Sequence, residues 1–214
     1  MVLTLAAGLL LPLGAQNTLL QAAGFAAVFP VSNLDSAALG PFREVLAEMM
    51  ARHAPYPALL CDRHWNVRDA NPTARALLAA MAPPSGELNA VRLLTDGPLA
   101  AAAVANLPEV IHEMAARIEL EALEAPGDPV LGDLLDALGA AAVRHPYRPL
   151  TTERRPLVPL MLNTPNGPLS FLSAIAHFGT SEDVTVRDLR LELLFPADHA
   201  TRAAMVALGK ALAG

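Results

Sequence analysis

Serine and histidine, the side chains that many hydrolases pair as nucleophile and base, occur together in the segment Leu169–Phe178. Ser173 and His177 would share one face of a strand there. A strand rises by about 3.3 Å per residue, so four residues separate the two side chains by roughly 13 Å. A serine nucleophile needs its base within hydrogen-bonding reach. The spacing therefore does not support a Ser–His hydrolase.

The sequence contains no pattern typical of a metal or phosphate site. His112 and Glu113 are followed by Met-Ala-Ala, which does not complete a His-Glu-x-x-His zinc helix, and there is no P-loop. The single cysteine, Cys61, lies in an apolar run and is expected to be a buried, inert thiol. The six histidines are scattered, at positions 53, 64, 112, 145, 177 and 199. We therefore predict no catalysis, no metal and no cofactor.

The composition is that of a domain with a large apolar core. The chain has 214 residues, 53% of them hydrophobic, and a formal net charge of −6. No apolar run reaches about 18 residues, so no membrane association is expected. The negative charge argues against nucleic-acid binding through the overall field of this chain. The first sixteen residues have an apolar core like that of a secretory signal. They lack a preceding Lys or Arg, so a cytoplasmic location is predicted.

The first quarter of the chain is predicted to be helical, with an irregular connector. Short helices are expected around Leu3–Leu10 and over Ala15–Ala23, where Gly24 ends the second one. Residues Phe25–Pro41 contain several helix breakers and are expected to form the connector. The spacing of the apolar residues then predicts an amphipathic helix over Phe42–Ala54.

A short hairpin and a helix are predicted next. Strands over Ala58–Cys61 and Val67–Ala70 flank a polar tip that contains the only tryptophan, Trp65. The amphipathic ring of Trp65 is expected to cover the edge of the core. Asn71 is expected to cap the following helix, Thr73–Met81, because Asn is a preferred N-cap residue and proline fits the first turn.

The rest of the chain changes from helical to strand-like periodicity. Asn166-Gly167 between two apolar runs indicates a hairpin, and Thr180–Val186 is expected to be a loop or short turn. The other predicted elements are helices over Leu107–Leu123 and Val130–Val143, strands over Leu157–Asn163, Leu169–Phe178 and Asp188–Phe195, and a final helix over His199–Leu212. The fold class is therefore α+β: a five-stranded antiparallel sheet with helices covering one face, preceded by short N-terminal helices.

Several stretches resemble a PAS domain. Tyr56–Trp65, followed by Ala70-Asn-Pro-Thr-Ala-Arg-Ala-Leu77, resembles the first hairpin and helix of that fold. More narrowly, it is similar to the ligand-binding domain of MmyB-like transcription regulators, the sensor half of one branch of XRE-type helix-turn-helix proteins. Further matching stretches, in order, are Asn89–Leu94, Val104–Leu107, Thr164–Phe171, His177–Thr180, Asp183–Thr185 and Leu194–Asp198.

The resemblance also implies a division into domains. Leu11–Phe25 resembles the last helices of an XRE-type DNA-binding domain. Residues 1–30 are therefore expected to be the C-terminal remnant of a helix-turn-helix domain, residues 31–41 a linker, and residues 42–214 a PAS-like ligand-binding domain. DNA would be bound only through helix-turn-helix elements missing from this chain, because the helices that enter the major groove are not among these residues.

The resemblance implies a homodimeric regulator that senses a small lipophilic, fatty-acid-like molecule in a PAS-type pocket and thereby modulates DNA binding. A polar anchor is expected at Arg92 or His112. The residues expected to line the pocket are Leu60, Leu77, Leu160, Leu162, Phe171, Ser173, Ile175 and His177. Two alternatives remain open: a dimerisation module with a filled core, and a small esterase that uses Ser173.

Overall fold

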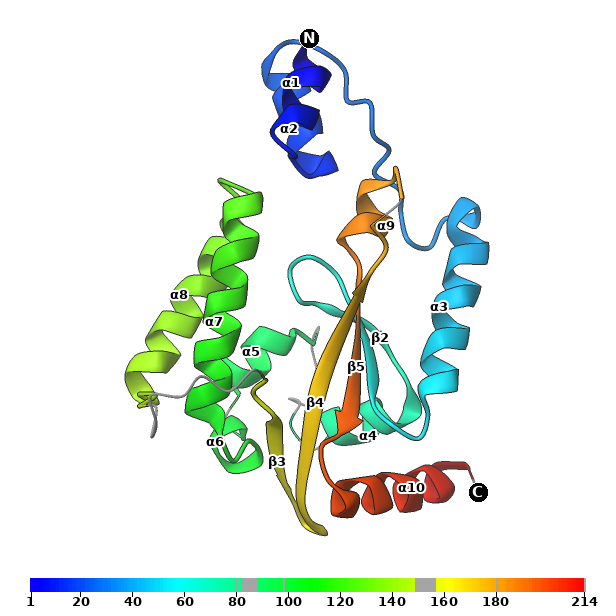
Figure 1. The fold of residues 1–214 in the computed structure, drawn as a ribbon, viewed down its shortest axis with the longest axis vertical. Coiled ribbons are helices and arrows are strands. Elements are labelled where there is room, and N and C mark those ends of the chain that lie inside the picture. Colours follow the sequence, from blue (N-terminus) through cyan, green and yellow to red (C-terminus); the bar gives the residue numbers. More distant parts are fainter. Residues whose placement is uncertain (80, 82–87, 98, 149–156, 180, 214) are drawn as a thin grey trace.

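The computed structural model describes residues 1–214 except 80, 82–87, 98, 149–156, 180 and 214. It has two visibly separate parts (Figure 1). A pair of short helices stands apart at one end, and the remaining chain forms a curled sheet with helices packed around it. No helix among the described residues is both long and apolar enough to cross a membrane.

The sheet is antiparallel throughout and has the strand order β2-β1-β5-β4-β3. The last strand lies in the centre, where it joins the first hairpin to the second. This arrangement confirms the α+β fold class and its five-stranded antiparallel sheet. The strands are β1 (Ala58–Cys61), β2 (Val67–Ala70), β3 (Leu160–Thr164), β4 (Gly167–His177) and β5 (Arg190–Pro196).

Helices pack on the sheet in two groups. Most of them lie against one face, which we call the cavity face, and α3 lies against the other, which we call the α3 face. The helices are α3 (Gly40–His53), α4 (Pro72–Ala79), α5 (Ala90–Thr95), α6 (Ala100–Ala103), α7 (Leu107–Glu124), α8 (Pro129–Arg144), α9 (Val184–Asp188) and α10 (His199–Ala213), with a short 3-10 turn, η1 (Ala37–Leu39), before α3.

The two faces follow from the alternation of side chains along each strand. Leu59 and Cys61 of β1 join the larger apolar cluster, which fills the space between the cavity face and the helices. Ala58 and Leu60 join a smaller cluster with Leu46 and Met50 of α3. All four residues of β1 are buried, because this strand is covered on both sides.

The antiparallel pair α7 and α8 forms the outer wall of the larger cluster (Figure 1). In α8 the buried positions are Leu131, Leu134, Leu138 and Ala141, which follow the spacing of one helical face. Asp128 caps this helix by accepting hydrogen bonds from two backbone amides of its first turn. The predicted helices over Leu107–Leu123 and Val130–Val143 are confirmed.

Asn71 connects the first hairpin to α4. Its Oδ1 accepts hydrogen bonds from the backbone N–H of Ala74 at 3.0 Å and of Ala58 at 3.2 Å. Its Nδ2 donates to the carbonyl oxygens of Tyr56 at 2.8 Å and Met50 at 3.3 Å. The predicted helix cap is therefore confirmed, and the same side chain also joins β1 to the end of α3.

Two elements differ from the sequence prediction. Part of the predicted loop Thr180–Val186 belongs to α9, which begins where the Asp183 carboxylate accepts a hydrogen bond from the N–H of Val186 at 3.2 Å. The strand expected from Leu157 begins only at Leu160, where pairing with Phe171 of β4 starts. The predicted Asn-Gly hairpin is present, since Thr164 and Gly167 close the β3–β4 turn.

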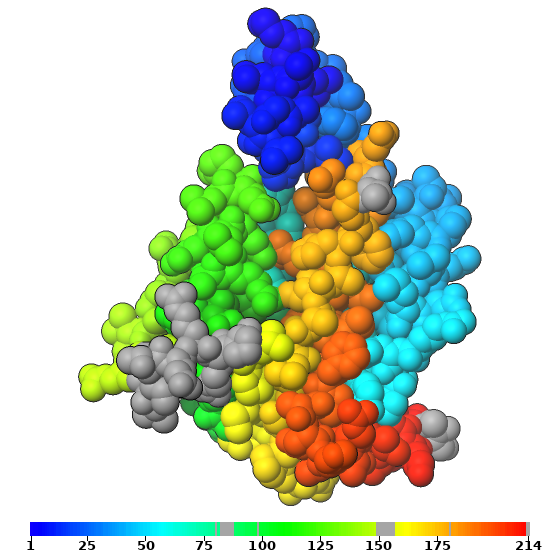
Figure 2. Space-filling model, viewed as in Figure 1, coloured from blue at the N-terminus to red at the C-terminus, as the bar shows by residue number. Residues whose placement is uncertain are grey.

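The N-terminal helices α1 (Val2–Gly8) and α2 (Leu13–Ala22) pack on each other. Asn17 of α2 holds the connector: its Oδ1 accepts from the N–H of Val28 and of Phe29, both at 3.0 Å. The connector then reaches α9, where the N–H of Val184 donates to the carbonyl of Pro30 at 2.9 Å. Figure 2 shows this pair of helices as a projection from the main body.

Candidate functional site

A cavity of about 180 Å³ lies between the cavity face of the sheet and helices α4, α5 and α7. Most of its wall is apolar, and among the described residues four lining residues carry charged or hydroxyl side chains. The apolar lining residues are Pro57, Leu59, Ala74, Leu77, Leu78, Met81, Ala90, Leu93, Leu94, Val110, Met114, Val158, Leu160, Leu162 and Leu194.

Helix α7 contributes one continuous stripe to this wall. Val110, Glu113, Met114 and Arg117 are spaced at i, i+3, i+4 and i+7, so they share one side of the helix. Methionine is flexible and polarizable, and therefore adapts to irregular spaces. The stripe gives the cavity one apolar side and two charged groups, a carboxylate and a guanidinium.

The sheet contributes the other two polar groups, Ser173 and Glu192. Ser173 lies on β4 and Glu192 on β5, two pairs apart in the register, because Ser173 pairs with Leu194 and Glu192 pairs with Ile175. The Ser173 hydroxyl donates a hydrogen bond to Glu192 Oε1 at 2.6 Å. A carboxylate and a hydroxyl are thus held together in the floor of an otherwise apolar cavity.

Trp65 packs directly behind the charged end of the α7 stripe. It is fully buried, and the guanidinium carbons of Arg117 and Arg190 lie 5.6 and 4.9 Å from the centre of its ring. Its Nε1 donates to Glu121 Oε2 at 3.0 Å, and Arg190 Nη2 lies 3.0 Å from the same oxygen. Trp65 has a φ of +64°, and its ring lies within the core and not only over its edge.

Burial shifts the pKa values of this buried group of charges. Desolvation raises the pKa of Glu121, although the nearby Arg190 charge and the Trp65 hydrogen bond oppose the rise. Desolvation lowers the pKa of Arg190, and Glu121 opposes that change. At the exposed end of β4, partial desolvation and then the charges of Arg190 and Arg117 lower the pKa of His177, which favours its neutral imidazole.

Four residues expected to bind a ligand do line the cavity: Leu77, Leu160, Leu162 and Ser173. Three other residues from the same prediction lie nearby without lining it. Phe171 is fully buried within the core, and Ile175 packs against the same cluster. His177 is exposed at the far end of β4, opposite Arg190 of β5.

Three further predicted positions do not line this cavity. Leu60 pairs with Leu191 on the α3 face, so it faces away from the cavity, and its neighbour Leu59 takes the expected place. Arg92 is exposed and forms an ion pair with Asp96 at 3.1 Å.

His112 is the third of these positions. It lies on the outer side of α7, where its ring packs against Tyr147 with ring centres 5.1 Å apart. The helical spacing of α7 therefore turns His112 away from the stripe that lines the cavity, although His112 directly precedes the lining residue Glu113 in the sequence.

The sequence prediction missed the charged lining residues Glu113, Arg117 and Glu192. Glu192 alternates with Leu191 and Leu193, and this alternation places it on the other side of the strand without showing that this side meets the cavity. The periodicity of α7 could have identified Glu113 and Arg117, because both follow Val110 at helical spacing.

The described residues contain no group of three or more His, Cys, Asp or Glu side chains placed to hold a metal ion. The Ser173 hydroxyl donates its hydrogen bond to the Glu192 carboxylate. The arrangement of these side chains therefore offers an apolar volume with a few polar contacts, which is the chemistry of a binding site.

An apolar cavity between an antiparallel sheet and helices is typical of small-molecule-binding domains of the α+β class. The family model described as "MmyB-like transcription regulator ligand binding domain" matches residues 42–208. The chain belongs to this family, and the resemblance inferred from the sequence is confirmed. The match runs from α3 into α10 and includes every residue that lines the cavity. No curated protein matches the chain.

Proposed function

We propose that this chain is the sensor of a bacterial transcription regulator and that a small lipophilic molecule binds in the cavity described above. One observation carries the proposal: within a family of regulator ligand-binding domains, this chain contains an apolar cavity with a small cluster of polar groups. Ligand binding alters DNA binding if the two states of the regulator differ in their affinity for the ligand.

The cavity volume limits the size of the ligand. An apolar cavity of about 150 Å³ admits a molecule the size of benzene. The volume of about 180 Å³ therefore suits a single ring or a short acyl chain, which is the small end of the fatty-acid-like class. A longer acyl chain requires α4 or α7 to move outward. That movement would transmit ligand binding to the rest of the regulator.

We further propose that residues 1–30 are the C-terminal end of an XRE-type helix-turn-helix domain, residues 31–41 a linker and residues 42–214 the sensor. The hydrogen bond between Val184 and Pro30 supports a coupling between the N-terminal helices and the sensor, because it joins the connector to α9. DNA is then contacted through helix-turn-helix elements other than α1 and α2, and the regulator acts as a cytoplasmic homodimer.

The test compares ligand-induced stabilisation of the wild type with that of a variant whose cavity is filled. Ala74 lines the cavity and is buried, so Ala74→Leu places extra carbon atoms in it. Ala51→Leu on the exposed side of α3 is the matched control. A ligand at about 100 times its Kd stabilises the folded state by about 2.7 kcal/mol.

Hexanol and hexanoic acid are suitable first probes, and the measurement is the Tm by differential scanning calorimetry. We expect a rise in Tm for the wild type and for Ala51→Leu, and little or none for Ala74→Leu. If the wild type does not respond to any probe from six to sixteen carbons, a dimerisation module with a filled core becomes the better explanation. Hydrolysis of acyl esters that is lost in Ser173→Ala would instead indicate the esterase.

A further inference from the structure

We propose that the ligand of this cavity carries a protonated amine, which the Glu192 carboxylate binds. The inference rests on the proposed function, because it concerns the chemical class of the molecule that the cavity accepts. It differs from the expectation of a fatty-acid-like ligand, whose headgroup is an anion at neutral pH. Among the described residues, the polar side chains of the cavity wall belong to Glu113, Arg117, Ser173 and Glu192.

Glu192 has unused capacity to accept hydrogen bonds. An ionised carboxylate offers about four acceptor positions. Among the described residues, the Glu192 side chain receives one hydrogen bond, from the Ser173 hydroxyl at 2.6 Å, and it has no ion-pair partner there. In the sheet it lies between Leu59 of β1 and Ile175 of β4, so its immediate neighbours in the floor are apolar. Glu192 is half-buried, so a ligand that covers it removes its remaining water, which costs free energy unless a donor of the ligand replaces that water.

Ser173 orients this carboxylate. Because its hydroxyl occupies Oε1, the second carboxylate oxygen remains for a ligand. A protonated amine offers up to three N–H donors on one small group, and charge-assisted hydrogen bonds are about twice as strong as neutral ones. The pair on the sheet therefore supplies a specific contact for a cationic headgroup, while the apolar wall contacts the carbon chain.

The charge balance of the wall also favours a cation. Glu113 and Glu192 contribute two carboxylates, and Arg117 contributes one guanidinium. Arg117 also stacks on the Trp65 ring at 5.6 Å and stabilises the charge of Glu121 behind the cavity. An anionic headgroup would be repelled by Glu192 in the floor, whereas a cationic one is attracted by both carboxylates.

The negative field of Glu192 is also felt next to the cavity. Burial raises the pKa of the Cys61 thiol to about 12, and the Glu192 charge is the second contribution to that rise. The nearby Arg190 charge opposes part of the rise.

The experiment compares three probes that share one apolar chain: n-hexylamine, n-hexanol and hexanoate. Their Kd values for the full chain are measured at pH 7 by isothermal titration calorimetry. We expect hexylamine to bind about tenfold more tightly than hexanoate, because a hydrogen bond to a charged group contributes enough for about one order of magnitude. Hexanol should fall between them.

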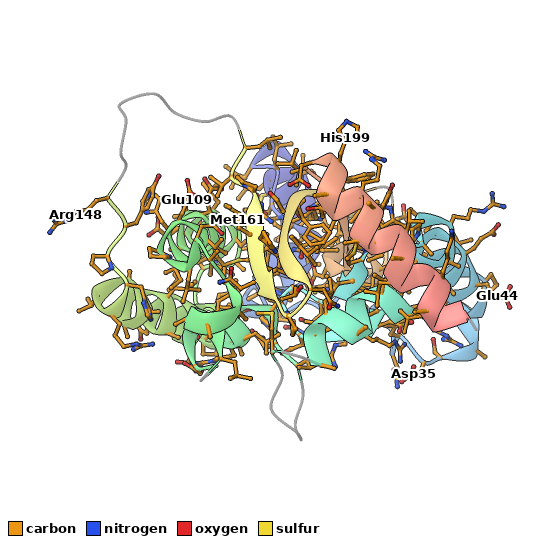
Figure 3. The ribbon with its side chains drawn as sticks, turned by 90° about the horizontal axis from the view of Figure 1, so that it is seen from below. Asp35, Glu44, Glu109, Arg148, Met161 and His199 are labelled. Atoms are coloured by element: carbon orange, nitrogen blue, oxygen red, sulfur yellow. The ribbon has the colours of Figure 1, made fainter. Side chains whose placement is uncertain are left out.

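The variant Glu192→Gln tests the assigned residue, since the amide keeps the shape of the side chain and removes its charge. It should abolish the preference for hexylamine while hexanol binding changes little. Glu44→Gln is the matched control: Glu44 is exposed on α3, at the outer edge of the molecule (Figure 3). The ranking of the three probes on the wild type decides the inference even if Glu192→Gln does not fold.

The outcomes separate this inference from the proposed function. If none of the three probes binds the wild type, the proposed function fails, and this inference fails with it. If hexanoate binds most tightly and Arg117→Gln removes that preference, the cavity is a binding site for anions. The inference is then overturned although the proposed function stands.

Discussion

Asn71 shows how much a single buried side chain can connect. Its four hydrogen bonds join the end of α3, β1 and the first turn of α4. Asn71→Ala removes all of them and leaves two backbone N–H groups and two carbonyls to find other partners. We expect the free energy of unfolding to fall by about 2–4 kcal/mol, from the loss of the cap and of buried hydrogen bonds.

Urea denaturation followed by circular dichroism measures this loss. Asn163→Ala is the control, because Asn163 is exposed on β3 and its side chain makes a hydrogen bond to the carbonyl of Ala102. An equal fall in the free energy of unfolding for the two variants would show that burial of the Asn71 hydrogen bonds adds no stability beyond that of an exposed one.

Cys61 is expected to be chemically inert in the folded protein. Its side chain is buried in β1, and burial together with the charges of Glu192 and Asp62 raises the pKa of the thiol to about 12. The thiolate is the reactive form, and almost none is present at pH 8. Ellman's reagent should therefore react slowly with the native protein and rapidly in concentrated urea. Rapid reaction without urea would contradict the burial of β1.

Among the elements, the start of α8 connects the helical wall to the tip of the first hairpin. The Asp128 carboxylate caps α8 through the N–H groups of Val130 and Leu131. Its Oδ2 also lies 2.9 Å from His64 Nε2 and 3.2 Å from Arg63 Nη2. One carboxylate thus stabilises a helix and holds the hairpin tip against it.

The pKa of Asp128 makes this contact dependent on pH. Burial alone would raise that pKa, but the His64 hydrogen bond, the Leu131 N–H and the Arg63 charge together lower it. Because the pKa is lower in the folded than in the unfolded state, the carboxylate contributes its full stability above its unfolded pKa, about 3.9. That contribution is lost as the pH falls through the lower, folded pKa.

Two substitutions separate the cap from the ion pairs. Asp128→Asn keeps a capping oxygen, whereas Asp128→Ala should cost about 1 kcal/mol more at pH 7 because the cap is also lost. Both should reduce the acid sensitivity of the protein, measured by urea denaturation at pH 7 and pH 3. Asp133→Asn, at an exposed position of α8, is the control. Unchanged acid sensitivity in both Asp128 variants would exclude this carboxylate as its source.

At the scale of the whole molecule, the N-terminal helices and the sheet should differ in local stability. The helices α1 and α2 project from the main body, and their connector is held by Asn17 and by the contact of Pro30 with α9 (Figures 1 and 2). Segments with little buried contact open more easily than the core. Hydrogen exchange measured by mass spectrometry should be at least about a hundredfold faster in α2 than in β5. Equal protection would mean that the two parts open together.

The local elements could be predicted well because their signals are local. Residues Ala58–Cys61 and Val67–Ala70 form strands with the predicted bounds, and the Asn71 cap follows from its place before Pro72. The pocket was harder to predict. All four residues of β1 are apolar and buried, so the alternation along this strand does not show which side faces the cavity. For this reason the sequence prediction named Leu60 as a lining residue, whereas Leu59 lines the cavity.

The order of helices and strands and the α+β class follow from the sequence, because periodicity and turn residues act over a few positions, and the family follows from its motifs. Which side of each strand meets which helix is visible only in the folded molecule. That choice depends on pairing between distant segments, and shifting a strand by one residue exchanges its two faces. The burial of Trp65, and the placement of Glu192 in the wall of the cavity, follow from that long-range packing.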